Sequence, residues 1–155
     1  MSARGSEGNT LLEIAAVLGI LGVLVTLTLS GFTQVRQDRL AEGVAWEVAQ
    51  TLRHAQQLAV ARSGEWRAVR VRFSDRVEVR GVWPDGAETE VVAATDRFPR
   101  GVRVIPLSRP LIQFSRSGSP TPGSNQTIEV GAGSAVRYVV LSGQTGRVRI
   151  TRTRP

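Results

Sequence analysis

Two arginines near the C-terminus have the residue type and spacing that suit contact with a phosphate backbone. Arg147 and Arg149 are separated by one residue, so in a regular strand they share one face and lie about 7 Å apart. This separation is comparable to the spacing of phosphates along one DNA strand. Gly146 before them can leave a backbone amide open to a phosphate, and Arg152 and Arg154 follow in the tail. The alternative interpretation is a solvated basic strand face without a ligand.

A second residue with chemical potential is Glu13, which stands at the start of a long apolar segment. Residues 14–35 carry no charged side chain, and as a helix they cover about 33 Å, enough for a hydrocarbon core of about 30 Å. A carboxylate inside a membrane costs about 2 to 3 kcal/mol and needs a partner. No basic side chain follows within two helical turns, so we expect the partner to be an amine created by cutting the chain upstream. A cut after Gly8 places the new terminus at Asn9, which favours an ion pair between neighbouring subunits.

The composition of the 155 residues excludes several kinds of chemistry. All 20 basic side chains other than the single His54 are arginines, and cysteine is absent. Lysine-dependent Schiff bases and P-loops, disulfides, thiol catalysis, cysteine-ligated zinc and multi-histidine metal sites are therefore excluded. A mechanism that uses carboxylates alone is compatible with the composition, but we expect no enzymatic activity, no cofactor and no metal.

The net charge of +7 is concentrated in the second half of the chain. Residues 36–96 contain 9 arginines and 10 acidic residues, whereas residues 97–155 contain 10 arginines and the single acidic residue Glu129. Such a block of positive charge attracts polyanions, and affinity that depends on phosphate contacts falls steeply with salt. Double-stranded DNA is the partner that this pattern favours.

The segment after residue 35 becomes polar but keeps a helical pattern. Apolar residues recur at steps of three and four until Ser63 and Gly64 interrupt the pattern. The stripe consists of Leu40, Val44, Val48, Leu52, Ala55 and Ala59. We therefore expect the apolar helix to continue as an amphipathic helix to about Arg62, with His54 near the stripe in a packing or solvated role.

The remaining residues alternate as strands do. In residues 67–73, valines and phenylalanine occupy one face and arginines the other. Further strands are expected around residues 77–81, 90–93, 102–105, 111–114, 127–130, 136–141 and 148–152, with a loop at 115–125. This pattern predicts an α+β fold in which a long N-terminal helix packs across an antiparallel sheet. The predicted parts are a leader at 1–8, a membrane helix at 9–35, an amphipathic helix at 36–64 and a β-rich domain at 65–155.

The N-terminal segment resembles the prepilin signal of type IV pilins and type II secretion pseudopilins. The resemblance rests on Gly8-Asn9-Thr10-Leu11-Leu12-Glu13 followed by the apolar helix, although Asn9 stands where these families usually have phenylalanine or methionine. It implies cleavage after Gly8 by a prepilin peptidase, N-methylation of Asn9, and guidance of subunits into a filament by Glu13. It also implies a single-pass location in the bacterial inner membrane before assembly, and afterwards in a pilus or pseudopilus in the periplasm or at the cell surface. An ordinary secretory signal and a plain membrane anchor are the alternatives.

The C-terminal part resembles the GspH and FimT group of minor pilins and pseudopilins. The similar segments are residues 98–104, 112–114, 139–142 and 145–149. Within the last of these, Gly146-Arg147-Val148-Arg149 is similar to the GRxR motif of FimT-type pilins, which bind DNA during natural transformation. The resemblance implies phosphate contacts by Arg147 and Arg149.

The same resemblance assigns supporting roles and leaves two other functions open. It implies supporting positive charge from Arg152, Arg154, Arg137 and Arg116. The partners that it implies are other pilin subunits, the prepilin peptidase, the inner membrane and DNA. One alternative is a type II secretion pseudopilin that contacts exported proteins, and the other is a structural minor pilin that primes filament assembly.

Overall fold

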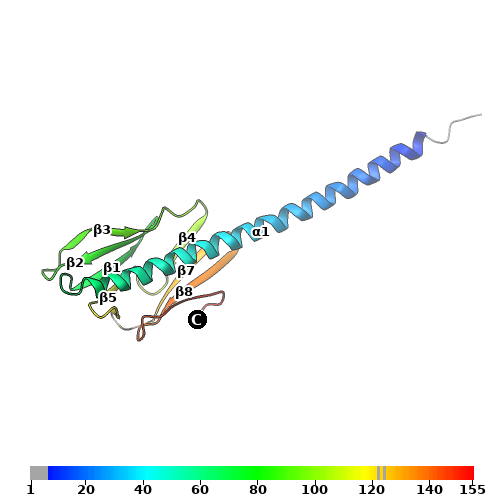
Figure 1. Cartoon of the computed structure of the whole chain (residues 1–155). Helices are drawn as coiled ribbons and strands as arrows, with labels where there is room; N and C mark the ends of the chain where they lie inside the picture. The colour runs from blue at the N-terminus through cyan, green and yellow to red at the C-terminus, as the bar shows by residue number, and fades with distance from the viewer. Residues whose placement is uncertain (1–6, 122, 124) are drawn as a thin grey trace, which may run out of the picture. The chain divides into compact units, whose positions relative to one another are not determined.

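The computed structural model describes residues 7–121, 123 and 125–155 as one helix followed by nine strands (Figure 1). The predicted leader therefore falls largely outside the described residues, as do the surroundings of Gly8 and the side chain of Asn9. The elements are α1 (Glu7–Ala61), β1 (Ala68–Phe73), β2 (Val77–Val82), β3 (Glu88–Ala94), β4 (Val102–Pro106), β5 (Leu111–Ser115), β6 (Pro120–Thr121), β7 (Gln126–Ala132), β8 (Ala135–Leu141) and β9 (Val148–Thr151). The chain divides into two compact units, one ending at Arg36 and the other beginning at Gln37.

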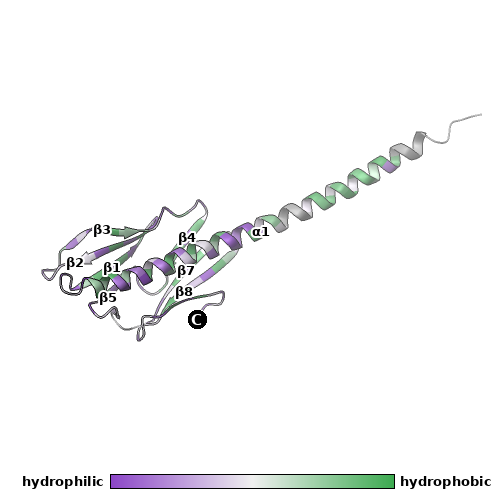
Figure 2. Cartoon of the chain, viewed as in Figure 1, coloured by the Kyte–Doolittle hydropathy of each residue, from purple (hydrophilic) through white to green (hydrophobic). Residues whose placement is uncertain are grey.

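The first unit contains the apolar part of α1. Its described large apolar side chains are all at least half exposed, as Leu12 and Phe32 illustrate with 75% and 69% of their surface exposed. Figure 2 shows the run of hydrophobic residues along this part of the helix. The helix is long and apolar enough to cross a membrane. Exposed apolar surface of this extent is unfavourable in water and is typical of a segment that contacts lipid or another protein.

In the second unit, α1 buries the stripe that the sequence predicts. Val48, Leu52 and Ala55 are fully buried, Val44 and Ala59 nearly so, and the helix ends at Ala61. His54 is exposed, which fits a solvated side chain. From Val44 onward, the residues of the stripe pack against apolar residues from both sheets in one core, whereas Leu40 packs against a second, small cluster. Figure 1 shows this part of α1 lying along the strands.

The strands form two antiparallel sheets, whereas the sequence pattern predicted a single sheet. The larger sheet has the order β3-β2-β1-β5-β6 and the smaller sheet the order β4-β7-β8-β9. Strand β6 lies within the predicted loop at 115–125 and pairs with β5 through two residues. The inward residues of both sheets meet the helix, as Phe114 of β5 and Leu141 of β8 show by their complete burial. A helix covering two sheets thus replaces the expected helix on one sheet.

Candidate nucleic-acid interface

The arginines of the predicted motif lie at the end of the hairpin that β8 and β9 form. Leu141 pairs with Val148, and Val140 pairs with Arg149. Leu141 and Val148 point into the core, so the alternation of a strand directs Arg149 outward. The connection is closed by a hydrogen bond from the Ser142 amide to the Arg147 carbonyl, with 2.9 Å between nitrogen and oxygen.

Gly146 shapes this connection and does not offer a free amide. Its φ of 68° lies in the left-handed region that glycine adopts without strain. Its amide donates to the Ser142 carbonyl at 2.9 Å, and the residue is buried. A Cβ atom at this position would collide with the side-chain amide of Gln56 on α1. The expected phosphate contact by the Gly146 amide is therefore wrong, and Gly146 instead allows the hairpin to approach α1.

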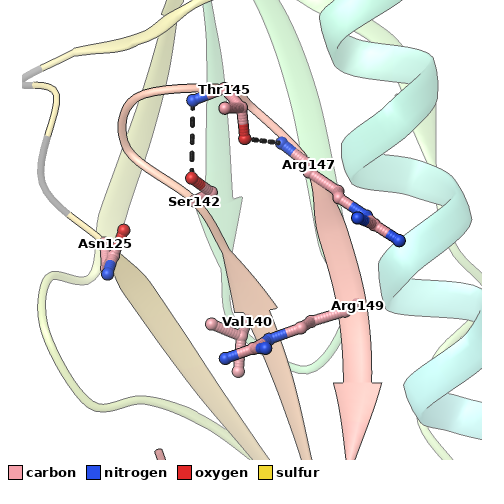
Figure 3. A pocket seen from close by; sticks show the side chains of 6 residues that line it. All are labelled: Asn125, Val140, Ser142, Thr145, Arg147 and Arg149. Atoms are coloured by element: carbon pink, nitrogen blue, oxygen red, sulfur yellow. Dashed lines mark hydrogen bonds between the residues drawn. The ribbon is translucent and has the colours of Figure 1, made fainter.

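Arg147 and Arg149 border the same cavity of about 370 Å³ (Figure 3). Both side chains are exposed at its rim. The other lining residues are Asn125, Val140, Ser142 and Thr145. Figure 3 shows Arg147 extending toward α1 and Arg149 extending across Val140. The two guanidinium groups thus diverge and do not share a strand face, because Arg147 lies in the turn before β9 begins.

The cavity wall also carries backbone and side-chain groups that form hydrogen bonds. Asn125 accepts a hydrogen bond from the Gly143 amide at 2.9 Å, which ties the start of β7 to the β8–β9 connection. Thr145 accepts one from the Arg147 amide at 3.3 Å. Two guanidinium groups and several neutral polar groups line the cavity, and none of the described residues that line it is a carboxylate. This chemistry suits an anion such as a phosphate group.

The remaining predicted arginines occupy different environments. Arg152 and Arg154 are exposed after the end of β9. Arg116 is exposed in the β5–β6 connection, and its Nε donates to the Trp66 carbonyl at 3.2 Å. It belongs to the larger sheet, so the described structure does not bring it into the cavity lined by Arg147 and Arg149.

Arg137 does not fit the supporting role that the sequence assigned to it. Its side chain is only 7% exposed and forms an ion pair with Asp38 of α1, with 3.3 Å between nitrogen and oxygen. Nη1 donates to the Val136 carbonyl at 2.9 Å, whereas Nη2 has no hydrogen-bond acceptor despite its ion pair. Arg137 is in phase with the buried Val139 of the same strand, so it faces the helix. The residue holds α1 to the smaller sheet and is closed to DNA.

The exposed arginines at the C-terminus have no acidic neighbours. Within the described part of the chain, none of Arg147, Arg149, Arg152 and Arg154 forms an ion pair with a carboxylate. No described carboxylate therefore neutralises their charge, which leaves it available for contact with a polyanion.

Sequence reasoning missed Arg53 of α1. Its Nη2 donates to the Val148 carbonyl at 3.3 Å. Val148 is the residue between Arg147 and Arg149, so a third guanidinium group lies next to the backbone that carries these two arginines. In the sequence, Arg53 follows Leu52 of the apolar stripe, which indicates only that Arg53 flanks the helix face that packs on the sheets. No local pattern relates it to a strand that begins 95 residues later.

Glu13 lies in the first unit with an exposed side chain. Its neighbours on the helix surface are the apolar residues Ile14, Val17 and Leu18. Among the residues that the structure describes, no arginine forms an ion pair with it. The role of Glu13 in subunit assembly stays a prediction.

Comparisons with known proteins agree with this architecture. Residues 44–146, more than half of the chain, match the family model of the type II transport protein GspH. A search of curated protein sequences finds no match. The fold is similar to that of the type IV minor pilin FimU of Pseudomonas aeruginosa, at 19% identity and a TM-score of 0.60 over 77% of this chain and 92% of FimU.

A second solved structure has the same fold. It is the minor pseudopilin EpsH from the type 2 secretion system of Vibrio cholerae, with 17% identity and a TM-score of 0.55 over 72% of this chain and 96% of EpsH. These matches confirm the predicted fold, one long N-terminal helix packed on antiparallel strands. The chain belongs to the GspH family and is a minor pilin or pseudopilin of a type IV pilus or a type II secretion system.

Proposed function

We propose that this subunit binds extracellular DNA during natural transformation through a C-terminal basic surface. This surface consists of Arg147, Arg149, Arg152 and Arg154. The observation that carries the proposal is that all four side chains are exposed and that none of them has an acidic partner in the described part of the chain. Arginines that contact phosphates release counterions, and this release drives binding that depends little on base sequence.

The proposal includes assembly of the processed subunit into a filament. A prepilin peptidase cleaves after Gly8, Asn9 is methylated, and Glu13 pairs with the terminal amine of a neighbouring subunit. The apolar half of α1 anchors the subunit in the inner membrane as a single span before assembly. The subunit is then a substrate of an enzyme but has no enzymatic activity and binds no cofactor.

The principal alternative is a pseudopilin whose β-rich domain contacts exported proteins. The family model that matches the chain is that of a type II transport protein, which favours this alternative. The match ends at residue 146, so Arg147 and Arg149 lie outside the region that it covers. DNA binding tests the two functions against each other, because contact with exported proteins does not require a phosphate-binding surface.

DNA binding is tested with the full chain in a nonionic detergent, by fluorescence anisotropy of a labelled duplex across a salt series. We expect the Arg147→Gln/Arg149→Gln variant to lose about 100-fold in affinity at low salt, because each charge-assisted hydrogen bond contributes about 1.5 kcal/mol or more. The slope of log K against log salt should fall by about 2, one unit for each phosphate that the variant no longer binds.

The matched control removes the same charge elsewhere. Arg67 and Arg109 are exposed and have no ion pair among the described residues, so Arg67→Gln/Arg109→Gln lowers the net charge equally. We expect this variant to lose less than about threefold in affinity. Equal losses in the two variants would show that only the total charge matters. Absence of salt-dependent binding by the parent would favour the secretion pseudopilin.

Processing and assembly are tested separately. Gly8→Val should leave uncut precursor, and sequencing of the parent should find Asn9 at the mature N-terminus. Glu13→Ala should be cut normally but enter filaments poorly, measured by immunoblot of sheared filaments. Normal entry of the Glu13→Ala subunit would remove the proposed role of this carboxylate.

A further inference from the structure

The C-terminal basic surface does not end at the hairpin, because the neighbouring helix carries an arginine and an exposed tryptophan beside it. Arg53 of α1 is bound to the Val148 carbonyl through Nη2. Its guanidinium carbon also lies 5.9 Å from the ring centre of Trp46, two helical turns earlier. Trp46 is 49% exposed. Arg53 therefore connects the exposed ring of Trp46 on α1 with the hairpin of β8 and β9.

The direction of the strands places Trp46 and Arg53 of α1 alongside the arginines of the hairpin. Gln56 binds the Gly118 carbonyl and abuts Gly146, whereas Gln37 binds Ser134 at the other end of β8. Strand β8 therefore runs in the direction of α1, and β9 returns antiparallel to it.

Simple geometry then gives the level of Trp46 relative to β9. From Arg53 back to Trp46 the helix covers about 10 Å, and β9 covers about the same distance from Val148 to Thr151. Trp46 thus lies at about the level of the end of β9 along the helix axis. Of the two acidic residues of α1 near Trp46, Glu47 accepts a hydrogen bond at Oε1 from the Asp96 amide, beside the larger sheet, whereas Glu42 lies one helical turn before Trp46.

We propose that the DNA site extends onto α1, where Arg53 binds a further phosphate and Trp46 stacks on an unpaired base, so that the site prefers single-stranded to duplex DNA. The inference rests on the proposed DNA-binding function and deepens it. Phosphates are available in both forms of DNA, whereas the bases of a duplex are stacked on one another. An exposed aromatic ring within a basic surface therefore adds affinity for single strands.

A second pair of arginine and tryptophan in the chain provides a control. The guanidinium carbon of Arg62 lies 5.7 Å from the ring centre of Trp66. However, Arg62 is paired with Glu65 at 3.0 Å, and Trp66 is buried. Trp83, which packs edge-on against Trp66, is 41% exposed but belongs to the larger sheet. Arg62 is therefore the control for Arg53, and Trp83 is the control for Trp46. Each control has the same side chain but lies away from the C-terminal basic surface.

The test compares a labelled oligothymidine with a duplex of equal length, each titrated with the full chain in detergent at fixed salt. Trp46→Leu should lower the affinity for oligothymidine about tenfold and that for the duplex less than twofold. Arg53→Gln should lower both affinities about tenfold. Trp83→Leu and Arg62→Gln should change neither. Oligothymidine should quench tryptophan fluorescence in the parent and in Trp83→Leu but not in Trp46→Leu.

The outcomes separate this inference from the function on which it rests. If Trp46→Leu binds oligothymidine as the parent does while Arg147→Gln/Arg149→Gln loses binding, the extension onto α1 is wrong and the DNA-binding function stands. If the parent binds neither form, both are wrong. Each variant is first checked for a parental circular dichroism spectrum. Should Arg53→Gln fail this check, Arg53→Met replaces it, and it should lower both affinities about tenfold, because it keeps an unbranched side chain and removes the cation that binds the phosphate.

Discussion

The two sheets use arginine in opposite ways. On the larger sheet, Glu88 binds Arg70 at 2.7 Å and Arg72 at 2.9 Å. Glu78 of β2 likewise binds two arginines, at 2.8 and 3.3 Å. On the smaller sheet, the exposed Arg149 and the arginines that flank it have no carboxylate partner among the described residues. The same side chain thus forms intramolecular networks on one sheet and leaves its charge available on the other.

The comparison teaches that the number of arginines does not identify a binding surface. Each strand of a sheet needs polar residues on its solvent face, and arginine fills that need in a chain without lysine. What distinguishes the C-terminal end of the smaller sheet is that its exposed arginines form no ion pair with a carboxylate among the described residues, whereas the buried Arg137 is paired with Asp38. A surface of this kind keeps a positive potential that attracts anionic partners, whereas a neutralised surface does not.

Among the changes that test this comparison, the largest effect is expected from giving Arg147 and Arg149 an acidic partner. Ser142→Asp places a carboxylate in the cavity lined by Arg147 and Arg149 and keeps an oxygen for the Thr145 amide. DNA affinity at low salt should fall about thirtyfold, or about 2 kcal/mol, because the carboxylate neutralises the arginines and repels phosphates. Anisotropy titration measures this loss. The control Ser74→Asp, next to Asp75 on the larger sheet, should bind as the parent does.

The second expected effect concerns Arg137, the arginine of the smaller sheet that is ion-paired. Asp38→Ala removes the carboxylate from a buried guanidinium and should lower the free energy of unfolding by about 1 to 2 kcal/mol, less than for a fully buried pair because Asp38 is half exposed. Adding Arg137→Met should recover most of this loss, since no buried charge then remains. Urea unfolding followed by tryptophan fluorescence measures both. DNA affinity should not change, and a large decrease would assign Arg137 to the interface.

Local patterns predicted most elements of this fold because they depend on neighbours in sequence. The period of the apolar stripe gave the end of α1 to within one residue, and the alternation in residues 67–73 gave β1. The division into two sheets depends on which strands pair, and no local pattern encodes it. Strand β6 was missed because two residues in a segment rich in glycine, serine and proline show no alternation.

The candidate site shows the same limit. Exposure of Arg149 follows from strand alternation, and the same rule applied to Arg137 would have placed it inside, in phase with Val139. The direction of Arg147 depends on a turn that Gly146 forms against α1. The contact of Arg53 with β9 joins residues 95 positions apart. These features arise from tertiary packing and are visible only in the structure.

A smaller effect is expected from making the larger sheet resemble the smaller one. Glu88→Gln keeps the shape of the side chain but leaves Arg70 and Arg72 without a carboxylate. The free energy of unfolding should fall by about 0.5 to 1 kcal/mol, as for partly exposed ion pairs. Nonspecific DNA affinity at low salt should rise about twofold, because two cations become available. Unchanged affinity would show that free charge alone does not create a binding surface and that the cavity at the hairpin is required.

The smallest effect is a dependence of stability on pH that arises from the larger sheet alone. Hydrogen bonds from Arg76 to Glu78 and from Arg70 to Glu88 lower the pKa of each carboxyl below its usual value, which burial partly opposes. Because the folded pKa lies below the unfolded one, this stabilisation is fully present above the unfolded value of about 4.3 and is lost as the pH falls through the folded pKa. Urea unfolding should therefore show the parent losing stability as the pH falls below about 5, and Glu78→Gln/Glu88→Gln losing less over the same interval. Parallel curves for the two proteins would mean that these carboxylates do not carry the acid sensitivity.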